Sequence, residues 1–358
     1  MEAPVRFGIV GGGWRAGFFL RVAHALPERF AVAGMMVRDA AKGRRLEEKW
    51  GVETHRTLDE LLQKRMRFVV LSVPWSVAPI LIQELAGGGV PVLTETPPAP
   101  DLEGLIHLHD LTRRGSRVQV AEQYPFQPLH AARLALASSG RLGTATQAQV
   151  SAAHGYHGAA LIRGFLGVGF ENATVTARRF VSPVVKGPDH QGPPASEVVL
   201  SPTQTIAHLD FGDRLGVHDF DPEQYFSWVR STRLLVRGER GEINGTTVRY
   251  LEDFRMPVTL DLLRQDAGHG GNLEGFYHKG IPAGSEWVYR NPFAPAALSD
   301  DEIAVATCLE KMALYADGGP GFYGLPGASQ DQYLALTLES SAASGETMTT
   351  STQPWANG

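Results

Sequence analysis

Over the first third of the chain, short apolar runs rich in β-branched residues alternate with amphipathic stretches of helical period. The pattern predicts six strands, at residues 5–10, 30–37, 52–55, 68–73, 90–95 and 118–122. Helix-start signals fall between them, such as Thr57 followed by Glu60, which together form a capping box. Such alternation is typical of a Rossmann domain, a doubly wound parallel sheet with helices on both faces.

After residue 122 the pattern changes to strands of period two with few helices between them. These strands are predicted at residues 146–152, 174–180, 205–211, 224–230, 233–237, 247–251 and 258–262. The glycine-bounded turn at residues 238–241 favours antiparallel neighbours. We therefore expect an α/β fold with a Rossmann domain at residues 1–122. Residues 123–358 are expected to form an α/β domain with a large, mostly antiparallel open sheet.

Helices in the second part are predicted at residues 129–138 and after two capping signals, Ser299 with Glu302 and Ser329 with Gln332. Three stretches lack periodicity: residues 181–202, residues 266–297 and the tail from residue 344. Loops of this length are uncommon in compact domains unless they are functional or disordered. The aromatic residues of 266–297 suggest either a stacking surface for a sugar or a small core that pins the loop.

The composition of the chain argues against nucleic acid and membranes as binding partners. The 358 residues suffice for two domains, and 33 Lys and Arg against 38 Asp and Glu give a formal charge of -5, which argues against nucleic acid. No apolar run approaches the roughly 20 residues of a membrane span, and no targeting segment precedes the first strand, so we expect no membrane partner. The single cysteine, Cys308, excludes an intrachain disulfide and favours a cytoplasmic location.

The first strand leads directly into a glycine-rich turn and a helix. The turn has the pattern G-x-G-x-x-A, with Gly11, Gly13 and Ala16 in register and Trp14 and Arg15 between them. Gly11 permits the tight turn, Gly13 lets the backbone approach a pyrophosphate, and Ala16 allows close packing of helix on strand. The motif predicts a site for NAD or NADP, with the helix N-terminus facing the phosphates.

The end of the second strand bears on the choice between the two nucleotides. Val37 stands where an acid would hold the ribose 2′-hydroxyl of NAD, and Arg38 follows it, with Lys42 nearby. An arginine there can pair with a 2′-phosphate, which favours NADP. The alternative is that Arg38 is a solvated surface residue and Asp39 turns inward to bind NAD.

Three segments together resemble the glucose-fructose oxidoreductase / inositol dehydrogenase / rhizopine-catabolism (Gfo/Idh/MocA) family. They are the glycine motif, Ser72-Val73-Pro74 after the fourth strand and Glu95-Thr96-Pro97 after the fifth, followed by a β-rich domain. The resemblance spans nearly the whole chain and implies an NAD(P)-dependent oxidoreductase of sugars, cyclitols or related compounds. It also implies that Ser72, Pro74, Glu95 and Pro97 lie at the cofactor, that residues 123–358 bind substrate, and that the protein is a homodimer or homotetramer.

The catalytic segments depart from the family pattern. The family commonly has Glu-Lys-Pro where this chain has Thr96 in the middle, so the lysine that polarises the reacting oxygen is absent. Counting back from Leu166-Gly167 places His157 on the family's histidine and Ala153 on its acid. His157 is therefore the candidate general acid or base. Tyr156 and His154 are weaker substitutes for the lysine, and Thr96 can still donate a hydrogen bond but carries no positive charge.

Other functions remain open from the sequence. His154 and His157 have an H-x-x-H spacing, but no nearby acid or cysteine completes a metal site, so we expect no metal. Two alternatives to a dehydrogenase of a carbohydrate-like substrate remain. The resemblance also implies an NAD-dependent glycosidase that keeps its cofactor bound, as in some members of the family. The missing lysine and acid motivate the other, a catalytically altered dinucleotide-binding protein.

Overall fold

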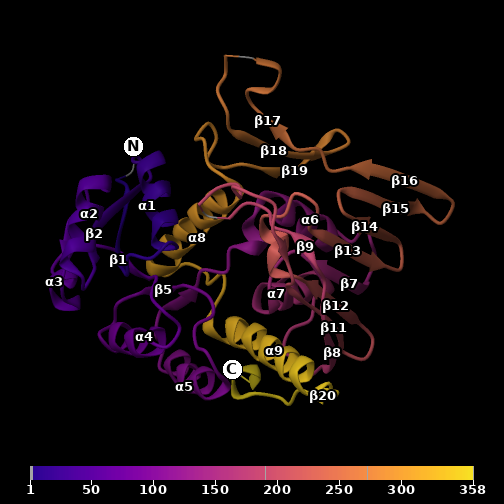
Figure 1. Cartoon of the computed structure of the whole chain (residues 1–358), viewed down its shortest axis with the longest axis horizontal. Helices are drawn as coiled ribbons and strands as arrows, with labels where there is room; N and C mark the ends of the chain where they lie inside the picture. Colours follow the sequence, from indigo (N-terminus) through magenta and orange to yellow (C-terminus); the bar gives the residue numbers. More distant parts are fainter. Residues whose placement is uncertain (1–2, 190, 272, 358) are drawn as a thin grey trace.

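The computed structural model describes residues 3–189, 191–271 and 273–357. Its N-terminal domain has a six-stranded parallel sheet in the order β3-β2-β1-β4-β5-β6 (Figure 1). The strands are β1 (Val5–Val10), β2 (Phe30–Met36), β3 (Thr54–His55), β4 (Phe68–Leu71), β5 (Val92–Thr94) and β6 (Val118–Val120). All six predicted strands are confirmed, four of them shorter at the C-terminal end. The order changes direction between β1 and β4, which is where such sheets bind dinucleotides.

Helices cover both faces of this sheet. They are α1 (Ala16–Ala25), α2 (Ala40–Trp50), α3 (Leu58–Leu62), α4 (Ala78–Gly87) and α5 (Leu102–Arg113). The predicted capping box is present, because the Thr57 hydroxyl accepts from the Glu60 amide and the Glu60 carboxylate accepts from the Thr57 amide. The carboxylates of Asp39 and Asp101 cap α2 and α5.

The second domain has a nine-stranded sheet in the order β16-β15-β14-β13-β7-β12-β11-β8-β20. Its strands are β7 (Ala145–Ser151), β8 (Thr174–Val181), β11 (Thr203–Asp210), β12 (Leu215–Phe220), β13 (Arg233–Gly238), β14 (Gly241–Asn244), β15 (Thr247–Asp253), β16 (Met256–Asp261) and β20 (Met348–Thr349). Every neighbouring pair is antiparallel except β7 with β12. The predicted turn is confirmed, since Gly238 pairs with Gly241 in the β13–β14 hairpin.

Helices pack on one face of this sheet and along the domain boundary. They are α6 (Pro128–Ser138), α7 (Gly155–Leu166), α8 (Asp300–Ala316) and α9 (Leu325–Ser344). Figure 1 shows α8 and α9 between the indigo N-terminal domain and the large sheet. Helix α8 completes a core cluster with α1 and β1, and the beginning of α9 completes the cluster on the opposite face of the Rossmann sheet. The C-terminal part of the chain therefore finishes the core of the N-terminal domain.

Short elements lie in the stretches without periodicity and in two other connections, at residues 124–126 and 222–225. They are β9 (Val184–Val185), β10 (Val199–Leu200), β17 (Gln265–Asp266), β18 (His278–Ala283), β19 (Glu286–Arg290), and the 3-10 helices η1 (Tyr124–Phe126), η2 (Pro222–Tyr225), η3 (His269–Gly271) and η4 (Pro354–Asn357). Strands β17, β18 and β19 form a separate sheet within the loop 266–297. The tail is not simply irregular, because Trp355 in η4 is buried and its indole donates to Gln330.

Two sequence predictions of local structure are wrong. Residues 224–230 do not form a strand, because Asp221 and Pro222 start the 3-10 helix η2 and the Asp221 carboxylate caps it. Ser329 does not begin a helix, because α9 already starts at Leu325, with Pro326 in its first turn. The Ser299–Glu302 capping box, by contrast, is present at the start of α8. No described helix contains a stretch long and apolar enough to cross a bilayer.

Candidate active site

A cavity of about 1290 Å³ lies between the two domains. The N-terminal domain contributes the glycine turn, the ends of β2 and β4, and the loop after β5. The second domain contributes residues at the start of α7, around η2 and at the start of α8. The phosphate-binding turn and the candidate catalytic histidine therefore open into the same space.

The glycine turn has the geometry expected of a dinucleotide site. Gly11 has φ +111°, and a Cβ on it would lie 2.0 Å from the carbonyl oxygen of Ser72. A Cβ on Gly13 would meet no atom within 4 Å, so the space beside it is open. Ala16 is 1% exposed and packs α1 onto the sheet. The turn leaves an open cradle at the N-terminus of a ten-residue helix, which fits an anionic diphosphate.

Two cations and one carboxylate line the cavity beyond β2. Arg38 is exposed there, Lys42 lies in the first turn of α2, and Val37 is buried beneath them. The Asp39 side chain accepts from the Lys42 amide at 2.9 Å and thereby caps α2. This cap holds the pKa of Asp39 below its ordinary value. The end of β2 therefore offers both positive charge and a carboxylate that is already used by the helix.

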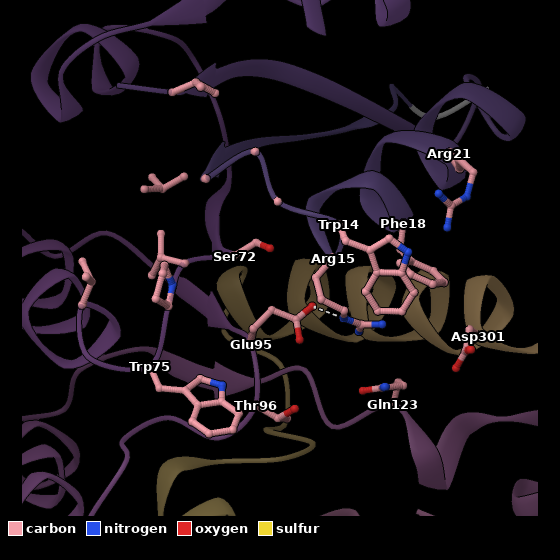
Figure 2. A pocket seen from close by; sticks show the side chains of 18 of the residues that line it. Trp14, Arg15, Phe18, Arg21, Ser72, Trp75, Glu95, Thr96, Gln123 and Asp301 are labelled. Carbon is pink, nitrogen blue, oxygen red and sulfur yellow. Dashed lines mark hydrogen bonds and ion pairs between the residues drawn. The ribbon is translucent and has the colours of Figure 1, made fainter. Parts of the chain in front are cut away.

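An ion pair crosses the cavity floor between the glycine turn and the loop after β5. Arg15 Nε donates to Glu95 Oε1 at 3.1 Å, as Figure 2 shows, and Thr96 follows Glu95 in the same loop. The guanidinium also lies 4.7 Å from the centroid of the Phe18 ring. Trp14 and Trp75 line the same cavity and are 55% and 54% exposed. Thr96 is thus held close to the turn that would carry the phosphates.

His157 is hydrogen-bonded to a carboxylate that the sequence did not indicate. Its Nδ1 lies 2.6 Å from Oε2 of Glu122, which follows β6 and is fully buried. The other oxygen, Oε1, accepts from the Tyr124 amide at 3.1 Å. Burial raises the pKa of Glu122 to about 8 and lowers the pKa of His157 to about 3. The sequence signal for this pair was an acidic residue just after a predicted strand, and that signal does not show which residue the acid contacts.

Most of the predicted site residues line the cavity. They are Gly11, Gly13, Trp14, Arg15, Arg38, Ser72, Pro74, Glu95, Thr96 and His157. Three others do not. Ala16 and Pro97 are buried, and Tyr156 is 2% exposed with its ring edge-on to His157, at a centroid distance of 5.3 Å. Successive helix residues point about 100° apart, so only one of the two neighbours on α7 reaches the cavity. A catalytic role for Tyr156 stays a prediction, for a side chain that does not line the cavity.

Several lining residues were missed or misplaced. Gln123 and Tyr124 follow Glu122, Asp301 lies in the first turn of α8, and Tyr225 and Phe226 lie at η2 within the wrongly predicted strand. The Tyr225 hydroxyl accepts from the backbone amide of His154 at 3.1 Å, which ties η2 to the start of α7. No described aromatic residue of the loop 266–297 lines the cavity, so the stacking-surface interpretation is not supported.

A family match covers the N-terminal domain. Residues 5–122 match the GFO_IDH_MocA model, described as an oxidoreductase family with an NAD-binding Rossmann fold. The N-terminal domain therefore matches the NAD-binding domain of the Gfo/Idh/MocA oxidoreductase family. The family resemblance inferred from the sequence is therefore confirmed, as are the α/β fold class and the NAD-binding oxidoreductase class.

Solved structures extend the likeness from residues 5–122 to both domains. An oxidoreductase from Agrobacterium radiobacter, in complex with NAD+, L-tartaric acid and magnesium, is 16% identical with a TM-score of 0.67, and the match covers 97% of this chain and 98% of that one. A myo-inositol dehydrogenase from Corynebacterium glutamicum is 18% identical, with a TM-score of 0.64 and coverage of 97% and 99%. A levoglucosan dehydrogenase in complex with NADH and levoglucosan is 14% identical, with a TM-score of 0.68 and coverage of 97% and 99%. At these identities the likeness establishes the shared fold. No curated protein matches the chain by sequence.

Proposed function

We propose that the protein transfers a hydride between a nicotinamide nucleotide and a sugar, cyclitol or related alcohol or carbonyl. The observation that carries this proposal is that one cavity joins the open cradle at Gly13 to His157. The structurally similar dehydrogenases, one of which is in complex with levoglucosan, support the substrate class. A small polar substrate between the two domains would meet the imidazole and the Thr96 hydroxyl.

In this proposal, one group of residues binds the cofactor and another acts on the hydroxyl group of the substrate. The backbone at Gly11 and Gly13 and the N-terminus of α1 would hold the diphosphate. A bound nicotinamide supplies the acceptor for the hydrogen and two electrons that leave the substrate carbon. His157 Nε2 takes the hydroxyl proton in that direction and returns it in the reverse direction. Thr96 donates a hydrogen bond to the same oxygen, without the positive charge that a lysine would bring.

We propose NADP as the preferred nucleotide. Arg38 and Lys42 at the end of β2 support a 2′-phosphate, and Asp39 is engaged as the cap of α2. Titration of the protein with NADPH and NADH, followed by nicotinamide fluorescence, tests the proposal. A lower dissociation constant for NADPH is expected, and tighter binding of NADH would contradict the preference.

We further propose that the protein is a homo-oligomer in which the outer face of the nine-stranded sheet meets a second copy. Helices α6, α7 and α9 pack on the inner face, where Leu234 and Val236 of β13 are buried. Arg233 and Arg237 of the same strand point the other way and are exposed. Light scattering during size-exclusion chromatography measures the mass directly. A dimer or tetramer is expected, and a monomer at micromolar concentration would contradict the proposal.

Turnover assays separate this function from its alternatives. Sugars, cyclitols and sugar acids are offered with NADP or NAD, and absorbance of the reduced nicotinamide is followed. Accumulation of reduced nucleotide supports the dehydrogenase. Release of the aglycone from a glycoside without net reduction would identify the glycosidase. Tight nucleotide binding with neither product would identify a protein with altered catalysis, which the threonine at position 96 makes worth testing.

A further inference from the structure

The catalytic candidate His157 takes its carboxylate partner from a distant part of the chain. Position 153, four residues before it, is a fully buried alanine. Glu122, at the end of β6, reaches Nδ1 instead. We propose that Glu122 is the positioning residue of this site, which fixes the imidazole with Nδ1 toward the protein interior and Nε2 available to substrate. This inference rests on the proposed proton-transfer role of His157.

The geometry holds the pair firmly. Glu122 is 0% exposed, and its two oxygens are engaged by the His157 ring at 2.6 Å and by the Tyr124 amide at 3.1 Å. The Tyr124 ring lies 4.4 Å from the imidazole centroid and limits its rotation. His157 lines the cavity whereas Glu122 does not. The carboxylate thus lies behind the imidazole, where it can orient the ring without contacting substrate.

Burial decides how the pair carries protons. It disfavours both the carboxylate and the imidazolium, raising the pKa of Glu122 to about 8 and lowering that of His157 to about 3. The pair therefore keeps one proton between Oε2 and Nδ1 at neutral pH and loses a single proton near pH 8. Above that pH, Nδ1–H donates to the carboxylate and Nε2 has a free lone pair. Below it, Nε2 carries a proton that can be donated.

Other ionisable groups face the pair from several elements. They are Arg15 just before α1, Glu95 after β5, Tyr124 in η1, His154 and Tyr156 at the start of α7, Tyr225 in η2, Asp301 and Cys308 on α8, Tyr323 before α9 and Asp331 on α9. Arg15 favours the ionised carboxylate, whereas Glu95 and Asp301 favour a protonated imidazole. These opposing charges partly cancel, and burial remains the largest influence on both members of the pair.

The test follows the ring nitrogens of His157 by nitrogen NMR of histidine-labelled protein, with the resonance assigned through His157→Asn. In the wild type the proton of the neutral ring is expected to move from Nε2 to Nδ1 as the pair loses its proton near pH 8. The isosteric variant Glu122→Gln should lose that transition. An internal control is present in the same spectra, because His278 Nδ1 lies 2.7 Å from Asp266 in the separate small sheet and should be unaffected. The same transition in both proteins would overturn the proposal.

Kinetics supply a second and separable readout. Glu122→Gln should lower kcat by roughly 10²- to 10⁴-fold, while the dissociation constant for the nucleotide stays unchanged. Glu122→Asp, which keeps the carboxylate, should recover part of the loss. An unchanged kcat in Glu122→Gln would count against the positioning role.

Two other outcomes are separable from this one. If no substrate is turned over at all, the proposed function fails, but the NMR transition still decides the role of Glu122. Should Glu122→Gln not fold, a wild-type His157 that titrates near its ordinary value of about 6.5 would refute the proposal.

Discussion

Arg15 and Glu95 form an ion pair of 3.1 Å that joins the start of α1 to the loop carrying Thr96. Their side chains are 23% and 11% exposed, so the pair is largely shielded from solvent. Glu95→Gln should lower the free energy of unfolding by about 1–3 kcal/mol, because the buried guanidinium loses a charged acceptor. Urea unfolding measures the change. The matched control is Glu53→Gln, which breaks the more exposed pair with Lys64 and should leave the midpoint nearly unchanged. Equal effects of the two substitutions would contradict the prediction.

The two glycines of the turn should respond differently to the same substitution. Gly13→Ala places a methyl group in open space, so stability should be preserved while affinity for the dinucleotide falls at least about tenfold. Gly11→Ala forces a Cβ against the Ser72 carbonyl at a positive φ and should cost more than about 2 kcal/mol of stability. Thermal unfolding and nucleotide titration measure both. Unchanged nucleotide binding in folded Gly13→Ala would show that no phosphate lies there.

Arg38 should determine the discrimination between the two nucleotides. Loss of a charge-assisted hydrogen bond is worth about 1.5–3 kcal/mol, so Arg38→Ala should weaken NADPH binding by roughly 10- to 100-fold. Binding of NADH should hardly change. Arg44→Ala is the control, because Arg44 is exposed on α2, the helix that follows Arg38, but does not line the cavity. Equal losses for NADPH and NADH would mean that Arg38 contacts a part common to both.

Thr96 tests how the site works without a lysine. If its hydroxyl donates to the reacting oxygen, Thr96→Val should lower kcat by about 5- to 30-fold, the value of one hydrogen bond. Thr96→Ser keeps the hydroxyl and should retain most of the activity. Steady-state kinetics on the best substrate of the panel compare the three proteins. A Val variant as active as the Ser variant would remove the hydroxyl from the mechanism.

The sequence predicted the parts of the site that depend on local order. Gly11 and Gly13 follow a strand and precede a helix, and that context is enough to locate the cradle. The Ser299–Glu302 capping box placed the start of α8 for the same reason. The period-two pattern predicts a strand that includes Tyr225, although Asp221 and Pro222 start a 3-10 helix there. At such a position the strand pattern and the helix-start signal conflict, and tertiary contacts determine which structure forms.

Contacts between segments that are distant along the chain could not be predicted from a single sequence. Glu122 and His157 are 35 positions apart, and nothing in the composition of either segment shows that β6 ends beside α7. The same holds for α8, whose apolar residues complete the core of the first domain. A domain boundary at residue 122 stays a prediction, and it does not reveal that α8 returns to complete the core of the first domain.

The Glu122–His157 pair should make the two directions of the reaction respond oppositely to pH. Oxidation of an alcohol needs the deprotonated pair, because Nε2 must accept the hydroxyl proton. Since burial raises the pKa of Glu122 to about 8, kcat for oxidation should rise as pH increases through that value. Carbonyl reduction needs the proton on Nε2, so its kcat should fall over the same interval. Initial rates in both directions, at saturating substrate and from about pH 6 to 10, check the prediction.

The control is the Glu122→Gln variant, which removes the carboxyl whose titration sets this interval. In this variant, the rise of kcat for oxidation and the fall of kcat for reduction near pH 8 should both disappear. If kcat in this variant still changes with pH near 8, the titration belongs to another group.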